Sequence, residues 1–167
     1  SPEQYASICA LLPPDDAAAR RDRLMLELMW NGGLRVAEVA ALTPGDLKRT
    51  SAGYLIDIRD GKGRKARSVF IGDELASRFT QWSEELPRDA RDLLPALEGV
   101  TKGRGVSTRY IRQRVTALSE QAGIRVSRRD GSTKPIGPHV LRHSYATRML
   151  AKGLPLTYLQ QQLGHSS

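Results

Sequence analysis

The sequence predicts a mostly α-helical domain of the α+β class with one small antiparallel sheet. Most of the 167-residue chain consists of segments with apolar residues at helical spacing, separated by proline and glycine. Two β-rich runs are joined by a glycine-rich tip. The length suits one hydrophobic core, so we expect residues 1–167 to form a single domain.

Three helices are expected in the first quarter of the chain, over residues 1–12, 15–31 and 34–42. Ser1 can cap the first of them, and the proline that follows suits a first helical turn. Gly32-Gly33 should end the second helix, because glycine is favoured just beyond a helix C-terminus.

A β-hairpin is expected next. Residues 54–59 and 68–71 are rich in β-branched and aromatic side chains. The segment between them, residues 60–65, has the sequence Asp-Gly-Lys-Gly-Arg-Lys. The sequence therefore predicts two antiparallel strands with a basic, glycine-rich tip.

The rest of the chain predicts four helices and one long basic loop. A helix should run from residue 73 to about 86, and another from Ser107 to the residue before Gly123. Residues 124–138 are expected to form the basic loop. The last two helices should cover residues 139–152 and 155–163, each followed by a glycine.

Composition excludes several classes of protein. With 40% hydrophobic and 26% charged residues, the chain is neither disordered nor collagen-like. No apolar run is long enough to span a bilayer, so we expect a soluble protein without a membrane partner. Cys9 is the only cysteine, which excludes an intrachain disulfide and a thiolate metal cluster and suits a reducing cytosol.

Basic side chains are concentrated in the last part of the chain. Residues 101–167 contain twelve Lys or Arg and two Asp or Glu, a net charge of +10, whereas residues 1–100 carry −2. Clustered cations gain free energy by displacing counterions from a phosphate backbone, so this asymmetry favours a nucleic-acid partner. A solvated basic surface that only maintains solubility is the alternative.

The strongest local motif is Pro138-His139-Val140-Leu141-Arg142-His143. His139 and Arg142 are three residues apart and should share one face in the first turn of a helix, where backbone N–H groups favour an anion. A phosphate group fits this position. The structural alternative is that His139 caps the helix and Arg142 pairs with a surface carboxylate.

The spacing of His139 and His143, four residues, also occurs in zinc sites. Such a site needs a third ligand and usually a glutamate after the first histidine, where Val140 stands, so we expect no metal. His143 shares its helix face with Ala146 and Leu150 and is predicted to be a packed, structural histidine.

Two further segments complete a pattern. Residues 31–38 place Arg35 at the start of a helix, and residues 153–167 place His165 directly after one. Together with Gly61-Lys62-Gly63 and the histidine-arginine motif, these segments, in this order, resemble the catalytic domain of the tyrosine recombinases, the phage-integrase family. The resemblance covers roughly residues 20–167 and implies the DNA breaking-rejoining fold.

The resemblance implies catalytic roles for Arg35, Lys62, His139, Arg142 and His165. The two arginines would hold the scissile phosphate, Lys62 would be the general acid and His139 the general base. His165 would donate a hydrogen bond to the phosphate. The reaction would pass through a 3′-phosphotyrosyl intermediate and would require no cofactor, because the covalent link conserves the energy of the bond.

The chemistry of phosphodiester cleavage supports these roles independently. Negative charge builds up on the non-bridging oxygens, and two guanidinium groups can bind them in a bidentate manner without a metal. A lysine on a hairpin can protonate the leaving 5′ oxygen, and a neutral imidazole can accept the proton of the nucleophile.

Each of these residues also has a structural alternative. Arg35 could pair with Glu38, for which we expect a structural role on the same helix. Lys62 could be an ordinary hairpin lysine, and Lys65 competes with it for the acid role. His165 could cap the preceding helix.

The nucleophilic tyrosine that the resemblance implies is not found in the chain. In the family it lies a short distance beyond the histidine equivalent to His165, where this sequence ends. Tyr145 is expected to be a packing aromatic, and Tyr158 lies in an apolar helix pattern. We expect a fragment without the N-terminal core-binding domain and the C-terminal nucleophile segment, which exposes an apolar groove near residues 159–163.

The expected function is that of a site-specific recombinase or integrase of a mobile element, with this chain binding DNA but not cleaving it. The partner would be double-stranded DNA, on which the intact parent self-associates as a tetramer, in the cytoplasm at the nucleoid. A type IB topoisomerase-like enzyme and a non-catalytic integrase-like DNA-binding module are the alternatives. Surface contacts with DNA are expected from Lys65, Arg67, Arg109, Arg112, Arg128, Arg129 and Lys134.

Overall fold

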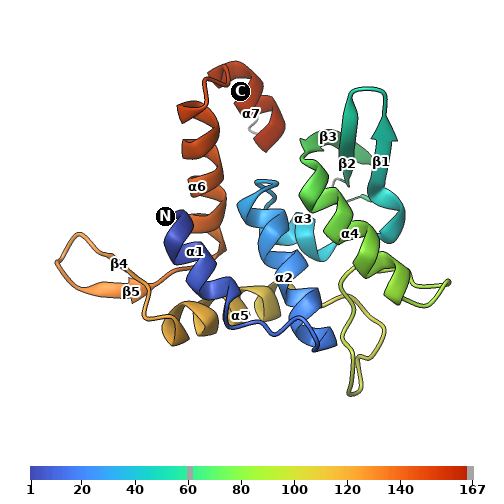
Figure 1. Cartoon of the computed structure of the whole chain (residues 1–167), viewed down its shortest axis with the longest axis horizontal. Coiled ribbons are helices and arrows are strands. Elements are labelled where there is room, and N and C mark those ends of the chain that lie inside the picture. Colours follow the sequence, from blue (N-terminus) through green and yellow to red (C-terminus); the bar gives the residue numbers. More distant parts are fainter. Residues whose placement is uncertain (60–61, 165–167) are drawn as a thin grey trace.

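A computed structural model describes residues 1–59 and 62–164 of the chain. The predicted site residue His165 lies outside the described residues, as do Asp60 and Gly61. The first elements are α1 (Pro2–Cys9), α2 (Ala17–Trp30), α3 (Val36–Ala40), the 3₁₀ turn η1 (Pro44–Asp46) and strands β1 (Leu47–Thr50), β2 (Gly53–Arg59) and β3 (Lys65–Ile71). They are followed by α4 (Asp73–Glu85), α5 (Thr108–Gln121), β4 (Arg125–Ser127), β5 (Thr133–Pro135), α6 (Pro138–Ala151) and α7 (Leu156–Leu163) (Figure 1).

The helices begin where polar side chains can satisfy their first backbone N–H groups. Ser1 and Gln4 form a capping box at α1. The Asp16 carboxylate accepts the backbone N–H of Ala19 at 2.9 Å, and the Ser107 hydroxyl caps α5 in the same way at 3.0 Å. All three starts agree with the sequence prediction.

Helix α2 lies at the centre of the fold and packs against α3, α4 and α6 (Figure 1). Leu24, Leu28 and Met29, which the sequence places on one apolar face, are fully buried. Leu26, on another side of the helix, is equally buried. The middle of α2 is therefore covered on all sides, as a core helix is, rather than on one stripe.

The predicted hairpin is confirmed and belongs to a three-stranded antiparallel sheet in the order β1-β2-β3. Its register pairs Ile56 with Val69, both fully buried, and shifts between Ile58 and Arg59. The third strand, β1, was not expected, because its sequence Leu-Lys-Arg-Thr is short, polar and largely exposed. Hydrogen bonds to β2 hold β1 in the extended conformation, because its own residues have little strand propensity.

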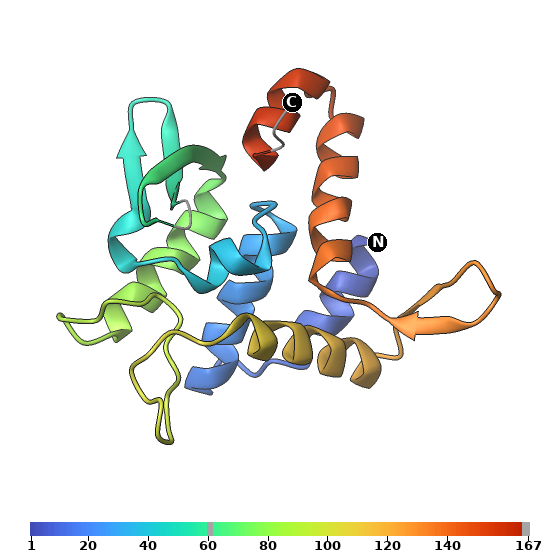
Figure 2. The same cartoon turned by 180° about the vertical axis from the view of Figure 1, so that it is seen from behind.

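The segment predicted as a basic loop contains a second, two-stranded hairpin, β4–β5, which corrects that prediction. The hairpin projects from the body of the molecule (Figures 1 and 2). Its strands have three residues each and mostly polar side chains, so they lack the alternating pattern that marks a strand. Asp130 accepts the backbone N–H of Ser132 at 2.9 Å and shapes the turn.

The two C-terminal helices contact each other, and α6 also packs against the central helix α2. Helix α6 rises from the body, and α7 turns back towards β3 (Figure 1). Their contact is a small apolar cluster of Tyr145, Leu159 and Leu163, distinct from the main core. Within the described residues, no helix combines the length and the apolar character needed to cross a bilayer.

A buried ionic cluster joins α2 to α5. Asp22, 1% exposed, accepts hydrogen bonds from Arg21 Nε at 3.0 Å, Arg114 Nε at 2.8 Å and the Tyr110 hydroxyl at 2.9 Å. Arg21 also donates to the Pro95 carbonyl at 3.0 Å. One buried carboxylate therefore pairs with two arginines, and the bond from Arg21 to Pro95 attaches the loop before α5 to the core.

We expect Asp22→Ala to lower the free energy of unfolding by about 3–5 kcal/mol, since it leaves a buried arginine without its counter-charge. Urea unfolding measures the loss. Glu85→Ala is the control, because it removes the partner of the exposed Arg20 and should cost far less. Equal losses in the two variants would contradict this role of Asp22.

Candidate active site

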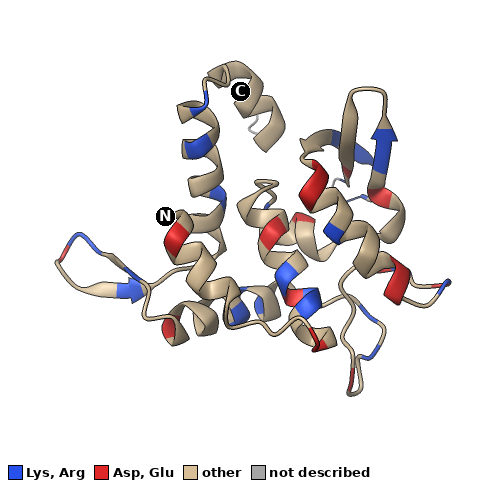
Figure 3. Cartoon of the chain, viewed as in Figure 1, with Lys and Arg blue, Asp and Glu red and all other residues tan. Residues whose placement is uncertain are grey.

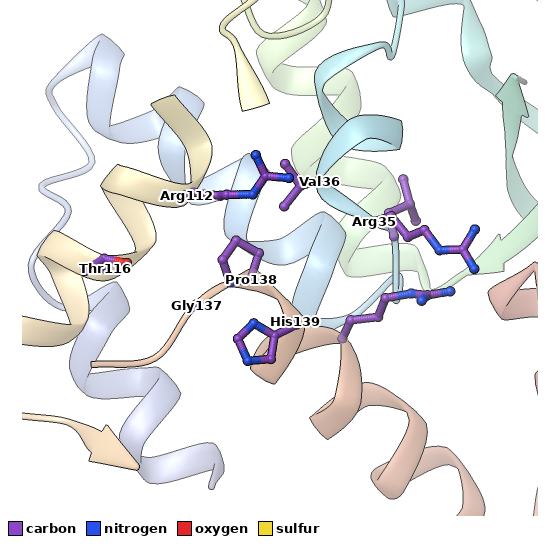
Figure 4. A pocket seen from close by; sticks show the side chains of 9 residues that line it. Arg35, Val36, Arg112, Thr116, Gly137, Pro138 and His139 are labelled. Atoms are coloured by element: carbon purple, nitrogen blue, oxygen red, sulfur yellow. The ribbon is translucent and has the colours of Figure 1, made fainter. Parts of the chain in front are cut away.

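Three elements that are distant in the sequence enclose a cavity of about 400 Å³. Figure 4 shows the side chains that line it: Arg35 comes from the start of α3, Arg112 and Thr116 from α5, and His139 from the start of α6, with the Arg35 guanidinium directed away from the other three. The cavity is lined by Leu34, Arg35, Val36, Arg112, Thr116, Gly137, Pro138, His139 and Arg142. Three of the five predicted catalytic residues, Arg35, His139 and Arg142, therefore meet in one place.

Arg35 is the exposed N-cap residue of α3. Its backbone N–H donates to Glu38 Oε1 at 2.8 Å, so the Glu38 carboxylate closes the first turn of the helix. Glu38 also forms an ion pair with Arg67. The structural role predicted for Glu38 agrees with these contacts, although its ionic partner is Arg67 on β3 and the contact with Arg35 is made through the backbone.

Gly33 connects the Arg35 loop to α6 by a very close approach. It has φ +69°, and a Cβ at this position would lie 2.4 Å from Cδ1 of Tyr145. The Gly33 carbonyl accepts a hydrogen bond from Arg142 Nε at 2.9 Å. Only glycine satisfies both the positive φ and the contact with the ring, so Gly33 allows the loop before Arg35 to pack directly against α6.

Arg142 is oriented by backbone carbonyls. Its Nε donates to Gly33 and its Nη2 to the carbonyl of Leu163. Burial lowers the pKa of Arg142 below its ordinary value, and the positive charges of Arg35 and Arg67 lower it further, against the opposing effect of Glu38. The guanidinium stays charged in an electropositive environment, where a bound anion would be stabilised.

His139 is exposed in the first turn of α6 and lines the cavity on the same side as Arg142. The prediction that His143 is a packed residue is wrong, because its side chain is exposed. Leu150, on the same helix face, is also 44% exposed, so this face of α6 does not reach the core. In the part of the chain that the structure describes, no group of three or more His, Cys, Asp or Glu side chains is placed to hold a metal ion.

Lys62 lies in the exposed turn between β2 and β3 and is not among the residues that line the cavity. The competing lysine, Lys65, contacts Asp57 at 3.6 Å. The structure therefore brings the arginines and His139 together but leaves both lysines outside the cavity. This hairpin is held by strand pairing at its base.

Most of the basic residues predicted to contact DNA are exposed or partly exposed. Arg109, Arg128 and Arg129 are exposed, on α5 and on the turn of the β4–β5 hairpin, and Lys134 is partly exposed on β5. Figure 3 shows basic residues on α5, on the hairpin and along α6. Arg112 is exposed at the edge of the cavity and forms only a long hydrogen bond, 3.4 Å, with Thr108.

Arg67 corrects the prediction of a surface contact. Its side chain is only 13% exposed and binds Glu38 and the carbonyl of Gln162. Alternation along β3 could have shown this, because Arg67 is two residues before the buried Val69 and shares its face. The residues that sequence reasoning missed altogether are Gly33 and Thr116, which become visible only when α3, α5 and α6 are placed together.

The tyrosines do not line the cavity. Tyr145 is 5% exposed, and burial raises its pKa, which agrees with the predicted packing role. On α7, Leu159 and Leu163 are buried, whereas Leu156 and Tyr158 are 57% and 37% exposed, so the apolar groove expected near residues 159–163 stays a prediction.

Comparison with known proteins identifies the family of the chain. The family model described as the phage integrase family matches residues 1–167, a wider range than the sequence motifs covered. Tyrosine recombinase XerC 1 of Ralstonia nicotianae is 33% identical over 100% of this chain and 52% of its own length. Tyrosine recombinase XerD of Neisseria meningitidis serogroup B is 35% identical over 98% of this chain and 53% of its own length. The chain thus spans about half the length of these relatives.

Two solved structures share the fold. The crystal structure of XerA recombinase superimposes with a TM-score of 0.77 at 25% identity, over 100% of this chain and 56% of that one. The site-specific recombinase XerH bound to its difH substrate, in a pre-cleavage complex, gives 0.75 at 26% identity over 99% and 45% of the two chains.

We expect Gly33→Ala to lower the free energy of unfolding by roughly 2–5 kcal/mol, because it adds a positive-φ penalty to a clash with Tyr145. Gly63→Ala is the matched control: it has φ +80° and no atom within 4 Å of the added Cβ, so only the conformational cost of about 1–2 kcal/mol applies. Thermal or urea unfolding of both variants separates the two contributions. Equal losses would show that the ring contact is unimportant.

We expect the ionised Glu38 carboxylate to stabilise the fold, so that the free energy of unfolding decreases at acidic pH. Burial acts to raise its pKa, but the hydrogen bonds from the Arg67 side chain and the Arg35 backbone, with the two positive charges, hold it below its ordinary value of 4.5. Its contribution is therefore complete above that value and is lost as the pH falls through the lower pKa of the folded state. Unfolding free energies of the wild type and Glu38→Gln should converge over this range, and a gap independent of pH would contradict the assignment.

Proposed function

Because the chain belongs to the phage integrase family, we propose that it is the catalytic part of a tyrosine-type site-specific DNA recombinase. The observation that carries this proposal is the convergence of Arg35, Arg142 and His139 on one cavity, from segments more than a hundred residues apart. The substrate would be the phosphodiester backbone of duplex DNA. A recombinase with the same fold, XerH, has been solved with its DNA substrate.

In this proposal the two arginines stabilise the charge that develops on the scissile phosphate. An arginine has five N–H donors, and in Arg142 two of the nitrogens donate to the carbonyls of Gly33 and Leu163. These bonds orient the guanidinium, while its remaining N–H groups are available for the non-bridging oxygens. Arg35, at the exposed start of α3, supplies a second guanidinium.

His139 and Lys62 would carry the proton transfers. His139 lies at the cavity and would accept the proton of the attacking tyrosine. Lys62 would protonate the leaving 5′ oxygen, which requires the β2–β3 hairpin to approach the cavity when DNA binds. His165 would donate a hydrogen bond to the phosphate.

The nucleophile would lie outside this sequence. Three of the five tyrosines have positions that argue against this role: Tyr5 stacks on Trp30, Tyr110 binds Asp22, and Tyr145 is buried. In the intact parent, a tyrosine would attack the phosphorus, form the 3′-phosphotyrosyl link and release the 5′ hydroxyl. The 5′ hydroxyl of a partner strand would then attack the link and restore the tyrosine, so no cofactor is consumed.

The relatives favour a recombinase over the two alternatives. Both curated relatives quoted above are named tyrosine recombinases, and neither is a topoisomerase. A module that only binds DNA has no need of an imidazole at the same cavity as two guanidinium groups. Self-association of the intact parent on DNA, as a tetramer, and a cytoplasmic location at the nucleoid belong to the same proposal.

We expect the chain to bind duplex DNA without sequence preference and with a steep dependence on salt, measured by fluorescence anisotropy. Replacing Arg128 and Arg129 together with alanine should lower the slope of log K against log salt by about 2, since each phosphate contact contributes about 1. Arg88→Ala, an exposed arginine after α4, should leave the slope unchanged.

The same duplex with a nick beside the target phosphate tests the chemistry. We expect Arg142→Ala to weaken binding and the wild-type chain to form no covalent adduct. A covalent complex that disappears in Tyr158→Phe would show that the nucleophile is inside the chain and would overturn this account. Absence of DNA binding by the wild type at low salt would overturn the proposed function itself.

A further inference from the structure

We propose that Arg67 is a positioning residue that connects α3, β3 and the C-terminus of α7. Through these contacts it fixes the positions of Arg35 and Arg142 relative to each other. The catalytic importance of these relative positions rests on the function proposed above. The connection itself rests on contacts that are independent of any ligand.

The Arg67 guanidinium binds two different elements at once. Its Nη2 donates to Glu38 Oε1 at 2.9 Å, and its Nη1 pairs with the other oxygen of the same carboxylate. Its Nε donates to the carbonyl of Gln162 at 2.9 Å. The side chains of Arg67 and Glu38 are only 13% and 11% exposed, so water screens this pair weakly. A planar, bidentate group is required to reach both partners, and lysine offers no such geometry.

On the α3 side, the contact with Glu38 is transmitted to Arg35. Glu38 Oε1 accepts both from Arg67 and from the backbone N–H of Arg35, the latter at 2.8 Å. The orientation of this carboxylate therefore determines the first turn of α3, from which the Arg35 side chain extends. Strand β3 holds the carboxylate through Arg67.

On the α7 side, two arginines cap the C-terminus of the helix. Arg67 binds the carbonyl of Gln162, and Arg142 binds the carbonyl of Leu163. The last carbonyls of a helix carry partial negative charge and have no partners within the helix, so cations are stabilised there. The position and orientation of Arg142 are thus coupled to the same helix end that Arg67 holds.

Gly164 is adapted to this arrangement. It ends α7 with φ +73°, and a Cβ there would lie 2.8 Å from Arg67 Nη1 and 2.9 Å from its Cζ. Gly164 therefore lies directly against the Arg67 guanidinium. A larger residue would be strained by its φ and would also displace the arginine.

These polar contacts matter because α7 has little else to hold it. Its buried apolar residues, Leu159 and Leu163, belong to the small cluster with Tyr145 and not to the main core. A second bond to the sheet runs from the Phe70 backbone N–H to Gln162 Oε1 at 3.0 Å. A short helix with few apolar contacts opens locally at low free-energy cost, so the loss of Arg67 should release it.

Docking of α7 should therefore be coupled to binding at the cavity. Arg142 joins the two, because its guanidinium contacts the Leu163 carbonyl and also lines the cavity. When α7 is released, Arg142 loses one of its two orienting carbonyls. Such coupling is reciprocal, so an anion that orders Arg142 should also stabilise α7.

Backbone amide hydrogen exchange in the intact 167-residue chain, without DNA, tests the proposal. We expect Arg67→Lys to lower the protection of amides 159–163 by roughly 10- to 100-fold, the equivalent of losing one or two hydrogen bonds from a charged donor. Protection in α2 should stay unchanged. Glu38→Gln, which contacts no atom of α7, should also lower α7 protection, because the neutral amide weakens the Arg67 fork.

The chain contains a matched control. Arg20 makes a similar set of contacts, three bonds to the Glu85 carboxylate and one to the Pro14 carbonyl, on a partly exposed surface that does not contact α7. Arg20→Lys should leave α7 protection unchanged. A merely structural arginine would lower protection throughout the chain, and this would appear in α2 as well.

Three outcomes would overturn the proposal: unchanged α7 protection in Arg67→Lys, equal losses in α2 and α7, or an effect of Glu38→Gln confined to α3. Anisotropy with duplex DNA adds a separate readout, in which Arg67→Lys should bind several-fold more weakly than Arg20→Lys. If the wild type fails to bind DNA, the proposed function fails, while the exchange data still decide the role of Arg67.

Discussion

Several positive charges have to share one small region of this molecule, and the fold is arranged around that requirement. Arg35 and Arg142 line the same cavity, and Arg67 lies close enough to lower the pKa of Arg142 further. Two kinds of hydrogen-bond acceptor stabilise these neighbouring positive charges. Backbone carbonyls of Gly33 and Leu163 orient Arg142 without neutralising it, and the Glu38 carboxylate neutralises Arg67 rather than the residues facing the cavity. The remaining positive charge is what an anionic substrate would meet.

A different solution appears at the other ionic cluster. Around Asp22, the carboxylate is fully enclosed and its donors come from α2 and α5, so its negative charge is paired within the protein. That cluster joins elements of the core, whereas the cavity leaves two guanidinium groups with capacity for a ligand. The same residue types therefore serve cohesion in one place and binding in the other, according to whether a carboxylate is buried beside them.

The local sequence was sufficient to predict the elements that depend on residues close together in the chain. The helix starts at Ser1, Asp16 and Ser107 follow from capping chemistry, and the hairpin of β2 and β3 follows from β-branched residues around a glycine-rich turn. The local sequence was insufficient to predict β1 and the β4–β5 hairpin. Their residues are mostly polar and show no alternation with apolar residues, so they become strands only through pairing. His143 was misplaced because helical spacing shows which residues share a face but not whether that face meets the core.

The sequence by itself determined which residues can do the chemistry, since guanidinium, imidazole and ammonium groups in that order and context are a property of the chain. Tertiary structure decided which of them act together. It placed Arg35, His139 and Arg142 at one cavity, left Lys62 on an exposed turn, and turned Arg67 inward to Glu38 and Gln162. The reason is that a side chain's neighbours depend on how helices and strands pack across long separations, and here one close approach, Gly33 against Tyr145, sets that packing.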